Sequence, residues 1–487
     1  MSSLSDARPE AAPQTDKAQP GAPGRMAAMN MVSEAGDDAQ EDGLAKISAN
    51  PLAEAFSRKM AVHAGMGGLP VAPEDLAATA GRLRQTRRGE PGVAYVHLPY
   101  CESKCLYCGF FGGKYTEEAG AAYVEALIGE IEADKDLPCV ASAPVRALYL
   151  GGGTPTALRA GELERLLRAL RRSLPLADDC EITVEGRTHN FGRDKMEACL
   201  EAGANRFSLG VQSFNTRIRR GLGRISDQTA TVRHLRELCS YERAAVVIDM
   251  IYGLPGQSLS DWEDDLRLFL DLPLDGVDIY QLNIFTGSPL AEAVESGRVR
   301  PAAPLSRQGE FFEKGALLLD KAGCRRLSSS HWGRTPRERN LYNPLVKSQA
   351  DCLHYGAGAG GFLHGYFMAN LRGVPQYIAQ AREGAKPLAM LAAAAGHRAA
   401  LRVILGQMEL CRLNLDELGA ALRSDRQNPP MDAYALYAPL LDNWQKAGLI
   451  LMNGPWMELT IAGQFWNVNI TRALIGRLRH INRERSQ

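Results

Sequence analysis

The sequence predicts an α/β fold, a parallel sheet of six strand–helix units that is open or closed into a partial barrel, followed by a smaller, largely helical domain that resembles a winged helix. Between residues 93 and 282, short apolar runs alternate six times with longer segments of helical period. That alternation is typical of parallel strands joined by crossover helices. The end of the chain combines helical periodicity with one short apolar hairpin, which indicates a separate module.

The expected strands are apolar runs that end at an unusual loop. They are Val93–Leu98, Val145–Leu150, Glu181–Glu185, Arg206–Leu209, Val246–Met250 and Val277–Leu282. Helices are expected between them at Thr116–Asp136, Gly161–Ser173 and Ser226–Tyr241. The loops that follow the six strands are PYCESKCLYC, GGGTPT, GRTHN, GVQSF, YGLPGQ and NIFTGSPL. Since active sites in such folds lie at the C-terminal ends of the strands, these loops predict one shared pocket.

The segments outside the barrel differ in texture. Residues 1–45 are rich in Ala, Pro, Ser, Asp and Gln without an apolar period, so we expect disorder there. We expect a helical extension at 46–90, the barrel at 91–300 and a glycine-rich, irregular, barrel-associated substrate region at 301–390. The winged-helix-like domain is expected at 391–487. Its helices are Arg398–Met408, Leu415–Leu422, Met431–Ala447 and one starting near Ala462, with the hairpin around Asn453 and Gly454.

Composition excludes several classes of function. Lysine and arginine together number 56, as do aspartate and glutamate, so the net charge gives no overall electrostatic attraction to nucleic acid. No run approaches the roughly 18 apolar residues of a membrane span, and the N-terminus has no apolar signal core, so we expect a cytoplasmic protein. A winged-helix module is usually associated with DNA, but a solvated terminal helix is the simpler interpretation of the arginines near the end: Arg472, Arg477, Arg479, Arg483 and Arg485.

Three of the ten cysteines stand within eight residues, at Cys101, Cys105 and Cys108. A structural zinc site needs four ligands, and its usual signature is two well-separated CxxC pairs. Disulfide pairing would leave one cysteine over in a reducing compartment. Three thiolates on a 4Fe–4S cluster leave one iron open for a chelating ligand, which suits an odd number of close cysteines. The other seven are scattered singly and are expected to be buried thiols: Cys139, Cys180, Cys199, Cys239, Cys324, Cys352 and Cys411.

The CxxxCxxC loop with Tyr107 before its last cysteine, together with GGGTPT at 151–156, resembles the radical S-adenosylmethionine (SAM) superfamily. That resemblance implies that the open iron binds SAM and that one electron cleaves SAM to a 5'-deoxyadenosyl radical. Seven segments resemble one branch of that superfamily in particular, the coproporphyrinogen dehydrogenase-like branch, and this resemblance extends over about residues 90 to 480. They are YVHLPYCESKCLYCGFF, LYLGGGTPT, EITVEG, NRFSLGVQSFN, LGR, IDMIYGLPGQ and YGAGAGG.

The same resemblance implies roles for residues at matching positions. The cluster ligands are the three cysteines, and Tyr107 lies within their loop as a further cofactor contact. The expected SAM contacts are Tyr95, Gly152, Glu185 and Gln281. The positions that would hold a second SAM molecule are Gly153, Thr154, Gln212, Arg224 and Asp249. An arginine such as Arg224 can pair with a carboxylate through two hydrogen bonds, as a methionine carboxylate requires.

Three subfamilies of this branch differ at short motifs. The dehydrogenases continue as Cys-Gly-Cys after the cluster loop, whereas here Gly109 and Phe110 follow Cys108. The haem chaperones carry His-Asn-x-x-Tyr, where this chain has RNLYN with Arg339. CGFF, EGRTHNF and AGQFWNVNIT resemble the anaerobic haem-utilisation methyltransferases. This resemblance implies methylation and opening of the haem ring with release of iron; the chaperone and dehydrogenase activities are the alternatives.

Haem as a substrate, or a related tetrapyrrole, raises the question of an axial ligand. Histidine is a usual one, and His331 is the first candidate because Trp332 beside it could offer a flat apolar face. His189, His354 and His364 are further candidates. We also expect one or two SAM molecules and a low-potential electron donor such as flavodoxin or ferredoxin, with no nucleic-acid partner.

Overall fold

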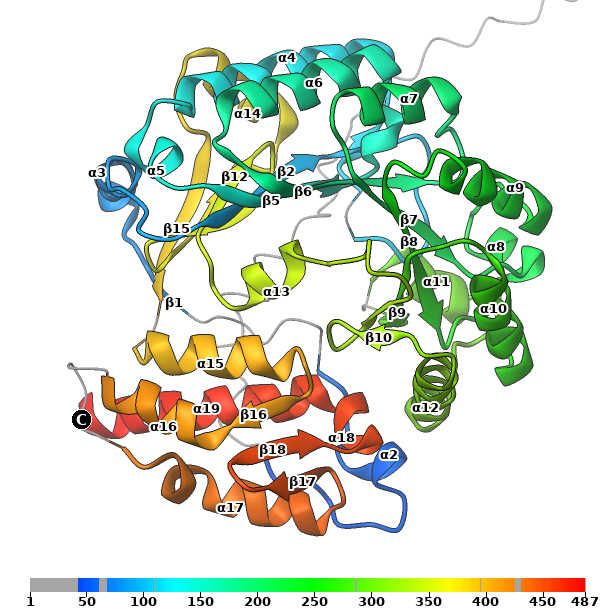
Figure 1. Ribbon diagram of the computed structural model, residues 1–487, viewed down its shortest axis with the longest axis vertical. Helices are drawn as coiled ribbons and strands as arrows, with labels where there is room; N and C mark the ends of the chain where they lie inside the picture. The colour runs from blue at the N-terminus through cyan, green and yellow to red at the C-terminus, as the bar shows by residue number, and fades with distance from the viewer. Residues whose placement is uncertain are drawn as a thin grey trace, which may run out of the picture.

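The fold is organised around one large curved sheet. The computed structural model describes residues 43–60, 68–109, 111–284, 287–394, 396–424 and 431–486, the last eight of these by backbone only. Within them, thirteen strands form a single sheet in the order β1-β15-β14-β13-β12-β2-β5-β6-β7-β8-β9-β11-β10. Helices cover its outer side (Figure 1). The predicted α/β fold with an incomplete barrel is confirmed, since no closure joins β1 to β10.

The middle of the sheet is parallel, as the apolar runs predicted. The six expected strands are β2 (Gly92–Leu98), β5 (Val145–Gly152), β6 (Leu176–Arg187), β7 (Arg206–Gln212), β8 (Ala245–Tyr252) and β9 (Gly276–Gln281). A further parallel strand, β12 (Cys352–Tyr355), pairs with the other edge of β2. Its four residues stand in a glycine-rich segment and are too few to show a period, so the sequence did not predict it.

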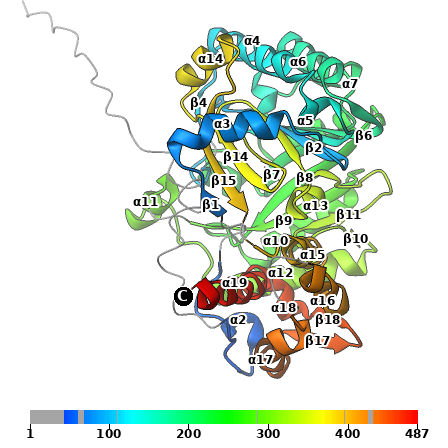
Figure 2. The same cartoon turned by 90° about the vertical axis from the view of Figure 1, so that its left-hand side faces the viewer.

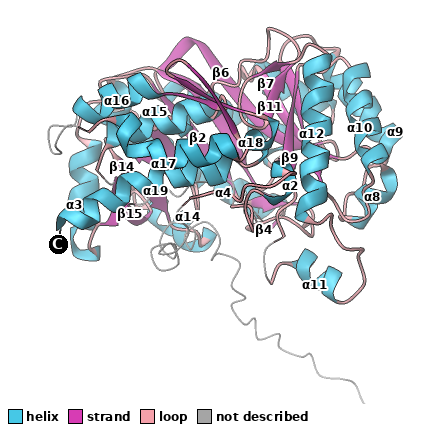
Figure 3. Cartoon of the chain, turned by 90° about the horizontal axis from the view of Figure 1, so that it is seen from below, coloured by secondary structure: helices cyan, strands magenta, loops and turns pink. Residues whose placement is uncertain are grey.

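Helices connect the parallel strands and bury their apolar faces against the outer side of the sheet. Figures 1 and 3 show α8, α9, α10 and α12 outside β7, β8 and β9. Trp262 of α10 is fully buried and donates its indole N–H to the carbonyl of Phe311 on α12 at 2.9 Å. The helices are α4 (Glu117–Asp134), α5 (Pro138–Ala141), α6 (Ala160–Ser173), α7 (Arg193–Glu201), α8 (Thr216–Gly221), α9 (Gln228–Cys239), α10 (Leu259–Asp271), α11 (Pro289–Glu295) and α12 (Leu305–Lys321).

The region expected to be irregular, 301–390, instead extends the sheet at both edges. At one edge β11 (His331–Gly333) pairs antiparallel with β9, and β10 (Arg325–Arg326) pairs with β11. At the other, an antiparallel series follows β12. It consists of β13 (Gly360–Leu363), β14 (Tyr366–Asn370), β15 (Leu388–Ala394) and β1 (Gly68–Pro70), with α13 (Tyr342–Lys347) and α14 (Val374–Arg382) between strands.

The C-terminal module has winged-helix order. Its elements are α15 (Arg398–Met408), β16 (Arg412–Asn414), α16 (Leu415–Ser424), α17 (Ala433–Lys446), β17 (Ile450–Asn453), β18 (Trp456–Leu459), α18 (Ile461–Phe465) and α19 (Asn467–Ser486). The three strands form their own sheet, β16-β18-β17. Of the arginines near the end of the chain, the side chains of Arg479, Arg483 and Arg485 lie outside the described part.

The start of the described chain packs both on this module and on α12 of the barrel. The Trp444 indole donates to the carbonyl of Gly43 at 2.9 Å, and the Asn443 amide oxygen accepts from the N–H of Ala45 at 2.7 Å. Helix α2 (Pro51–Glu54) lies beside the module, while α3 (Pro73–Arg84) lies at the β1 edge of the sheet (Figure 2). Residues 1–42 of the segment expected to be disordered lie outside the described residues. Among the described helices, none combines the length and apolar character needed to cross a bilayer.

Candidate active site and its cysteine loop

The three clustered cysteines follow β2 at the C-terminal end of the parallel strands. Cys101 lies in the short strand β3 (Tyr100–Cys101), which pairs with β4 (Gly113–Lys114) and so closes the loop at its base. Cys101 and Cys105 are buried, Cys108 is half-buried, and none of the three forms a disulfide. The backbone N–H of Cys108 donates to the carbonyl of Cys105 at 3.2 Å. The loop therefore presents three cysteine side chains from one compact turn.

Two side chains donate hydrogen bonds to the sulfur of Cys101, one from the turn after β5 and one from the end of β6. The Thr154 hydroxyl lies 3.2 Å from Cys101 Sγ, and the Arg187 Nη2 lies 3.6 Å from it. Burial raises the pKa of Cys101, and Thr154 and Arg187 oppose that rise, while Cys108 and Cys105 add to it. These donors suit a thiolate, which is the ligand form of cysteine.

The donor set fits an iron–sulfur cluster. Within the described residues, no three His, Cys, Asp or Glu side chains converge closely enough to hold a single metal ion. A cuboidal cluster does not need such convergence, because each thiolate binds an iron of its own. Cys101, Cys105 and Cys108 would hold the cluster, and the two hydrogen bonds at Cys101 are of the kind that tunes such centres.

The glycine-rich turn after β5 lies directly against the cysteine loop. Gly153 donates its N–H to the carbonyl of Leu98 at 2.7 Å. A Cβ on Gly153 would stand 2.6 Å from the carbonyl oxygen of Tyr100, and one on Gly152 would stand 2.5 Å from the ring of His97. Gly152 also has a φ of +107°, which favours glycine. The turn therefore needs glycine at both positions to pack under the cysteine loop.

Polar side chains from β2, β5 and β6 form a layer inside the sheet below this turn. Glu185 accepts from the Tyr149 hydroxyl at 2.6 Å and from the N–H of Gly152 at 3.2 Å. Tyr95 and His97 of β2 share a hydrogen bond of 2.9 Å. Burial raises the pKa of Glu185, although its two donors oppose that rise. Burial lowers the pKa of His97 to about 4, so this imidazole is neutral at physiological pH.

A second group of predicted residues gathers around the guanidinium of Arg224. Its Nη2 donates to the Tyr107 hydroxyl at 2.7 Å, and its Nη1 donates to the carbonyl of Gly210 at 2.8 Å. Arg224 Nε and Gln212 Oε1 are buried without a hydrogen-bond partner among the described residues. Gln212 has a φ of +72°, which is strained for a residue with a side chain. Buried polar atoms without partners are uncommon, and they mark where a polar ligand could bind.

Two carboxyl groups face each other across β8 and β9. Asp249 and Asp278 are paired in the register of the two strands, and Ser208 donates to Asp249 at 3.4 Å. Burial raises the pKa of Asp249 to about 7, and the charges of Asp278 and Glu185 add to the rise. Ionisation of both neighbouring carboxyl groups at once is unfavourable, so Asp249 carries a proton over part of the physiological range.

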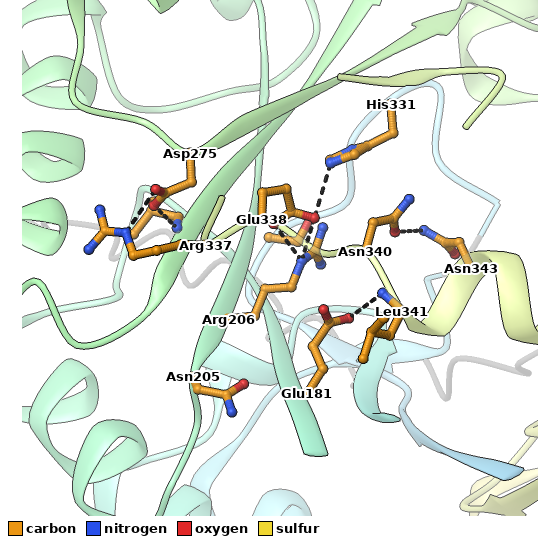
Figure 4. A network of polar contacts seen from close by, with 12 residues as sticks. Glu181, Asn205, Arg206, Asp275, His331, Arg337, Glu338, Asn340, Leu341 and Asn343 are labelled. Atoms are coloured by element: carbon orange, nitrogen blue, oxygen red, sulfur yellow. Dashed lines mark hydrogen bonds and ion pairs between the residues drawn. The ribbon is translucent and has the colours of Figure 1, made fainter. Parts of the chain in front are cut away.

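The structure corrects the expectation that His331 lies on the rim with an open ring. His331 is fully buried, with Nδ1 2.6 Å from Asp278 and Nε2 3.1 Å from Glu338, whose carboxylate also accepts from Arg206 Nε at 3.0 and 3.1 Å (Figure 4). Trp332 is buried too, with the guanidinium of Arg326 4.6 Å from its ring centre. Neither side chain offers a free face to haem, because both face buried partners from other elements.

The other candidate histidines lie at different heights of the sheet. His189 is at the rim, 3.9 Å from the carboxylate of Glu102, with its side chain 39% exposed. His354 lies buried in β12, and burial together with the charge of Lys386 lowers its pKa. His364 lies in the β13–β14 turn, where its Nε2 contacts the carbonyl of Thr86 at 3.1 Å. Of the four histidines, His189 alone adjoins the cysteine loop.

The remaining predicted residues are dispersed. Gln281 at the end of β9 donates to Gln308 of α12, and its side chain has no hydrogen bond to another predicted site residue among the described ones. Arg339, at the position of the chaperone histidine, donates to the carbonyl of Asp179 at 2.8 Å, beyond the opposite ends of the strands from the cysteine loop. Phe110, the other departure from the dehydrogenase pattern, lies outside the described residues.

Three site residues were not singled out from the sequence: His97, Tyr149 and Arg187. His97 and Tyr149 belong to strands whose other residues are almost all apolar, and a polar side chain in such a strand is a usable signal. Arg187 lies in the GRTHN loop, which was quoted as a motif without a role. Its contact with Cys101 joins residues 86 positions apart in sequence.

Comparison with known proteins agrees with this geometry. The family model of the radical SAM superfamily matches residues 95–269. Anaerobilin synthase of Escherichia coli O157:H7 is 42% identical over 421 residues, which are 86% of this chain and 92% of that protein. Heme chaperone HemW of Escherichia coli K12 is 31% identical over 56% of this chain and 70% of its own length. The structure of coproporphyrinogen III oxidase HemN from Escherichia coli, 23% identical, aligns with a TM-score of 0.68 over 82% of this chain and 92% of its own.

Fold and cysteine loop together define an iron–sulfur protein of the radical SAM class. The chain belongs to the coproporphyrinogen dehydrogenase-like branch of the radical SAM superfamily, in the same family as anaerobilin synthase. Its cofactors are those of the superfamily, a 4Fe–4S cluster and SAM.

Proposed function

We propose that this protein uses SAM to methylate haem and open its ring, releasing iron without oxygen. The observation that carries the proposal is the site itself: three cysteines outside any disulfide at the strand ends, beside a glycine turn and buried polar atoms without hydrogen-bond partners among the described residues. The similarity to anaerobilin synthase over most of both chains supports haem as the substrate. A low-potential donor such as flavodoxin or ferredoxin would supply electrons, and the reaction would take place in the cytoplasm.

The cluster, when bound, supplies the electron that cleaves SAM to a 5'-deoxyadenosyl radical. The protein positions the reactants and excludes water around them. Glu185, held by Tyr149 and Gly152, is a fixed acceptor for an amino or ribose hydroxyl group. Tyr95 and His97 form one wall of the same layer. We assign the first SAM molecule to this side of the site.

A second SAM molecule is proposed beside Arg224. The guanidinium of Arg224 makes no ion pair with a carboxylate among the described residues, so the carboxylate of a methionine group would complete its contacts. Gln212, with a buried oxygen that lacks a partner, is suited to accept from an amino group. Gly153 and Asp249 would also lie within this half of the site. Thr154 has a different contact, since its hydroxyl donates to Cys101.

The Asp249 carboxyl is suited to handle a proton during ring opening. Its pKa of about 7 leaves both forms populated near neutral pH, which is the condition for efficient general acid–base catalysis. Asp278 holds that pKa up through its own charge, and His331 fixes Asp278 in place. The residues thus present one exchangeable proton inside the barrel.

The test is an anaerobic reaction of cluster-loaded protein with haem, SAM and a low-potential reductant, with products resolved by mass spectrometry. We expect 5'-deoxyadenosine, S-adenosylhomocysteine and an iron-free, methylated, linear tetrapyrrole. Cys105→Ala should abolish all three, while Cys199→Ala, a buried cysteine of α7, should keep them. Haem that binds and returns unchanged would contradict the proposal and favour a chaperone, which the similarity to HemW raises as the second candidate.

A further inference from the structure

The GRTHN loop after β6 holds the first half of the cysteine loop. Asn190 donates its amide N–H to the carboxylate of Glu102, and His189 lies 3.9 Å from the same group. Arg187 Nη1 donates to the carbonyl oxygen of Ser103 at 3.0 Å and lies 3.3 Å from its hydroxyl. Three residues of one loop therefore contact consecutive residues of the other. The contacts fix the segment between the first two cysteines.

Arg187 also reaches the sulfur of Cys101, at 3.6 Å from Nη2. One nitrogen of the guanidinium therefore contacts the two oxygens of Ser103, and the other contacts the Cys101 sulfur. No carboxylate of the described residues forms an ion pair with Arg187, so its positive charge is not neutralised locally. The side chain is partly buried, which limits screening of that charge by water.

We propose that Arg187 sets the reduction potential of the cluster through this contact with Cys101. The inference rests on the proposed function, because it needs a cluster on the three cysteines. Reduction adds negative charge to a cluster and its thiolates, and a hydrogen-bond donor with positive charge stabilises the reduced form more than the oxidised form. Arg187 therefore raises the potential and makes the cluster easier to reduce by a given donor. Thr154 adds a neutral hydrogen bond to the same sulfur.

The expected size follows from the strength of one charged hydrogen bond. Such a bond contributes about 1.5 kcal/mol, which is roughly a tenfold change in an equilibrium constant. For a one-electron couple, a tenfold change is about 59 mV. Losing the guanidinium should lower the midpoint potential by up to about that amount, because part of the bond's free energy is lost from the oxidised cluster as well.

The experiment compares wild type with Arg187→Gln and Arg187→Lys. Each protein is loaded with its cluster anaerobically, iron and sulfide per chain are measured, and the midpoint potential is determined by a redox titration followed by electron paramagnetic resonance, without SAM or haem. We expect the lowest midpoint in Arg187→Gln and an intermediate one in Arg187→Lys, which keeps the charge and loses the planar fork. Arg193→Gln is the matched control: this exposed arginine of α7 pairs with Glu237 at 3.1 Å and should leave the midpoint unchanged.

Several outcomes separate the possibilities. A full cluster with the wild-type midpoint in Arg187→Gln would overturn the inference and leave the proposed function standing. If Arg187→Gln fails to hold a cluster, Arg187→Lys decides: a lowered midpoint supports the inference, and the wild-type midpoint overturns it. A wild-type protein that takes up no 4Fe–4S cluster would refute the proposed function and the inference together.

Discussion

Replacing Glu338 by glutamine should loosen the interior of the barrel around β9 and β11. Glu338 lies between His331 and Arg206, and the side chains of all three are 3% exposed or less. Removing one partner of a buried ion pair leaves an uncompensated charge and costs about 3–5 kcal/mol. We therefore expect the Glu338→Gln variant to open locally far more often than wild type, by at least a hundredfold in the opening constant.

The effect should depend on pH with a definite sign. Burial alone would lower the pKa of His331, but Asp278 and Glu338 raise it from 6.5 to about 9. That difference corresponds to about 3 kcal/mol of stability. This stabilisation is fully present below pH 6.5 and is lost as the pH rises through 9, because His331 of the folded protein then loses its proton and its ion pairs. In Glu338→Gln the pKa of His331 should be raised less, so the loss should be complete at a lower pH and the gap to wild type should narrow towards pH 9.

Hydrogen exchange followed by mass spectrometry measures the opening of each segment separately, which suits a chain of more than one domain. Peptides that cover β9 and β11 are compared between variant and wild type at equal pH, so the intrinsic exchange rates cancel. Glu164→Gln is the control, since Glu164 and Arg168 form an exposed ion pair on α6 and contribute little. Unchanged exchange of β9 and β11 in Glu338→Gln, or a gap that is constant from pH 6.5 to 9, would refute the reasoning.

Other predictions concern the site. Gly153→Ala should reduce the iron content after reconstitution, because its Cβ would meet the Tyr100 carbonyl oxygen at 2.6 Å, whereas Gly161→Ala, whose Cβ meets nothing within 4 Å, should keep it. Tyr107→Phe should weaken SAM binding by up to about tenfold in Kd, measured by equilibrium dialysis, since Arg224 loses the partner that positions it. Asp249→Asn should raise the thermal midpoint increasingly as the pH rises from about 4 to 7: the folded pKa of this carboxyl is raised, so ionisation is unfavourable in the folded state and the amide avoids it. A flat difference in melting temperature across that range would contradict this.

The sequence predicted the parallel strands because each is an apolar run bounded by a polar loop. The observed bounds of β2, β8 and β9 differ from the expected ones by at most two residues at either end. The strands added at the edges of the sheet are short and lie among glycines. Their pairing depends on which edge is free, and a local pattern does not record that.

The site shows the same division between local and distant information. The cysteine spacing and the glycine turn are local, and they predicted the loop that the structure places at the strand ends. The burial of His331 was not predicted, because its partner Asp278 stands 53 residues away. The contact of Arg187 with Cys101 was not predicted for a similar reason, since these residues are also far apart in sequence. Buried charge pairs and hydrogen bonds to sulfur depend on tertiary contacts, which residue spacing does not encode.

The pairing of β12 with β2 has a consequence for biosynthesis. Strand β2, which leads into the cysteine loop, has β5 on one side and β12 on the other, and β12 ends at Tyr355. A nascent chain that has just exposed its three cysteines lacks one of these neighbours until some 250 more residues have left the ribosome, as the positions of Cys101 and Tyr355 require. We therefore expect iron and sulfide to be delivered only after β12 has been made and pairs with β2.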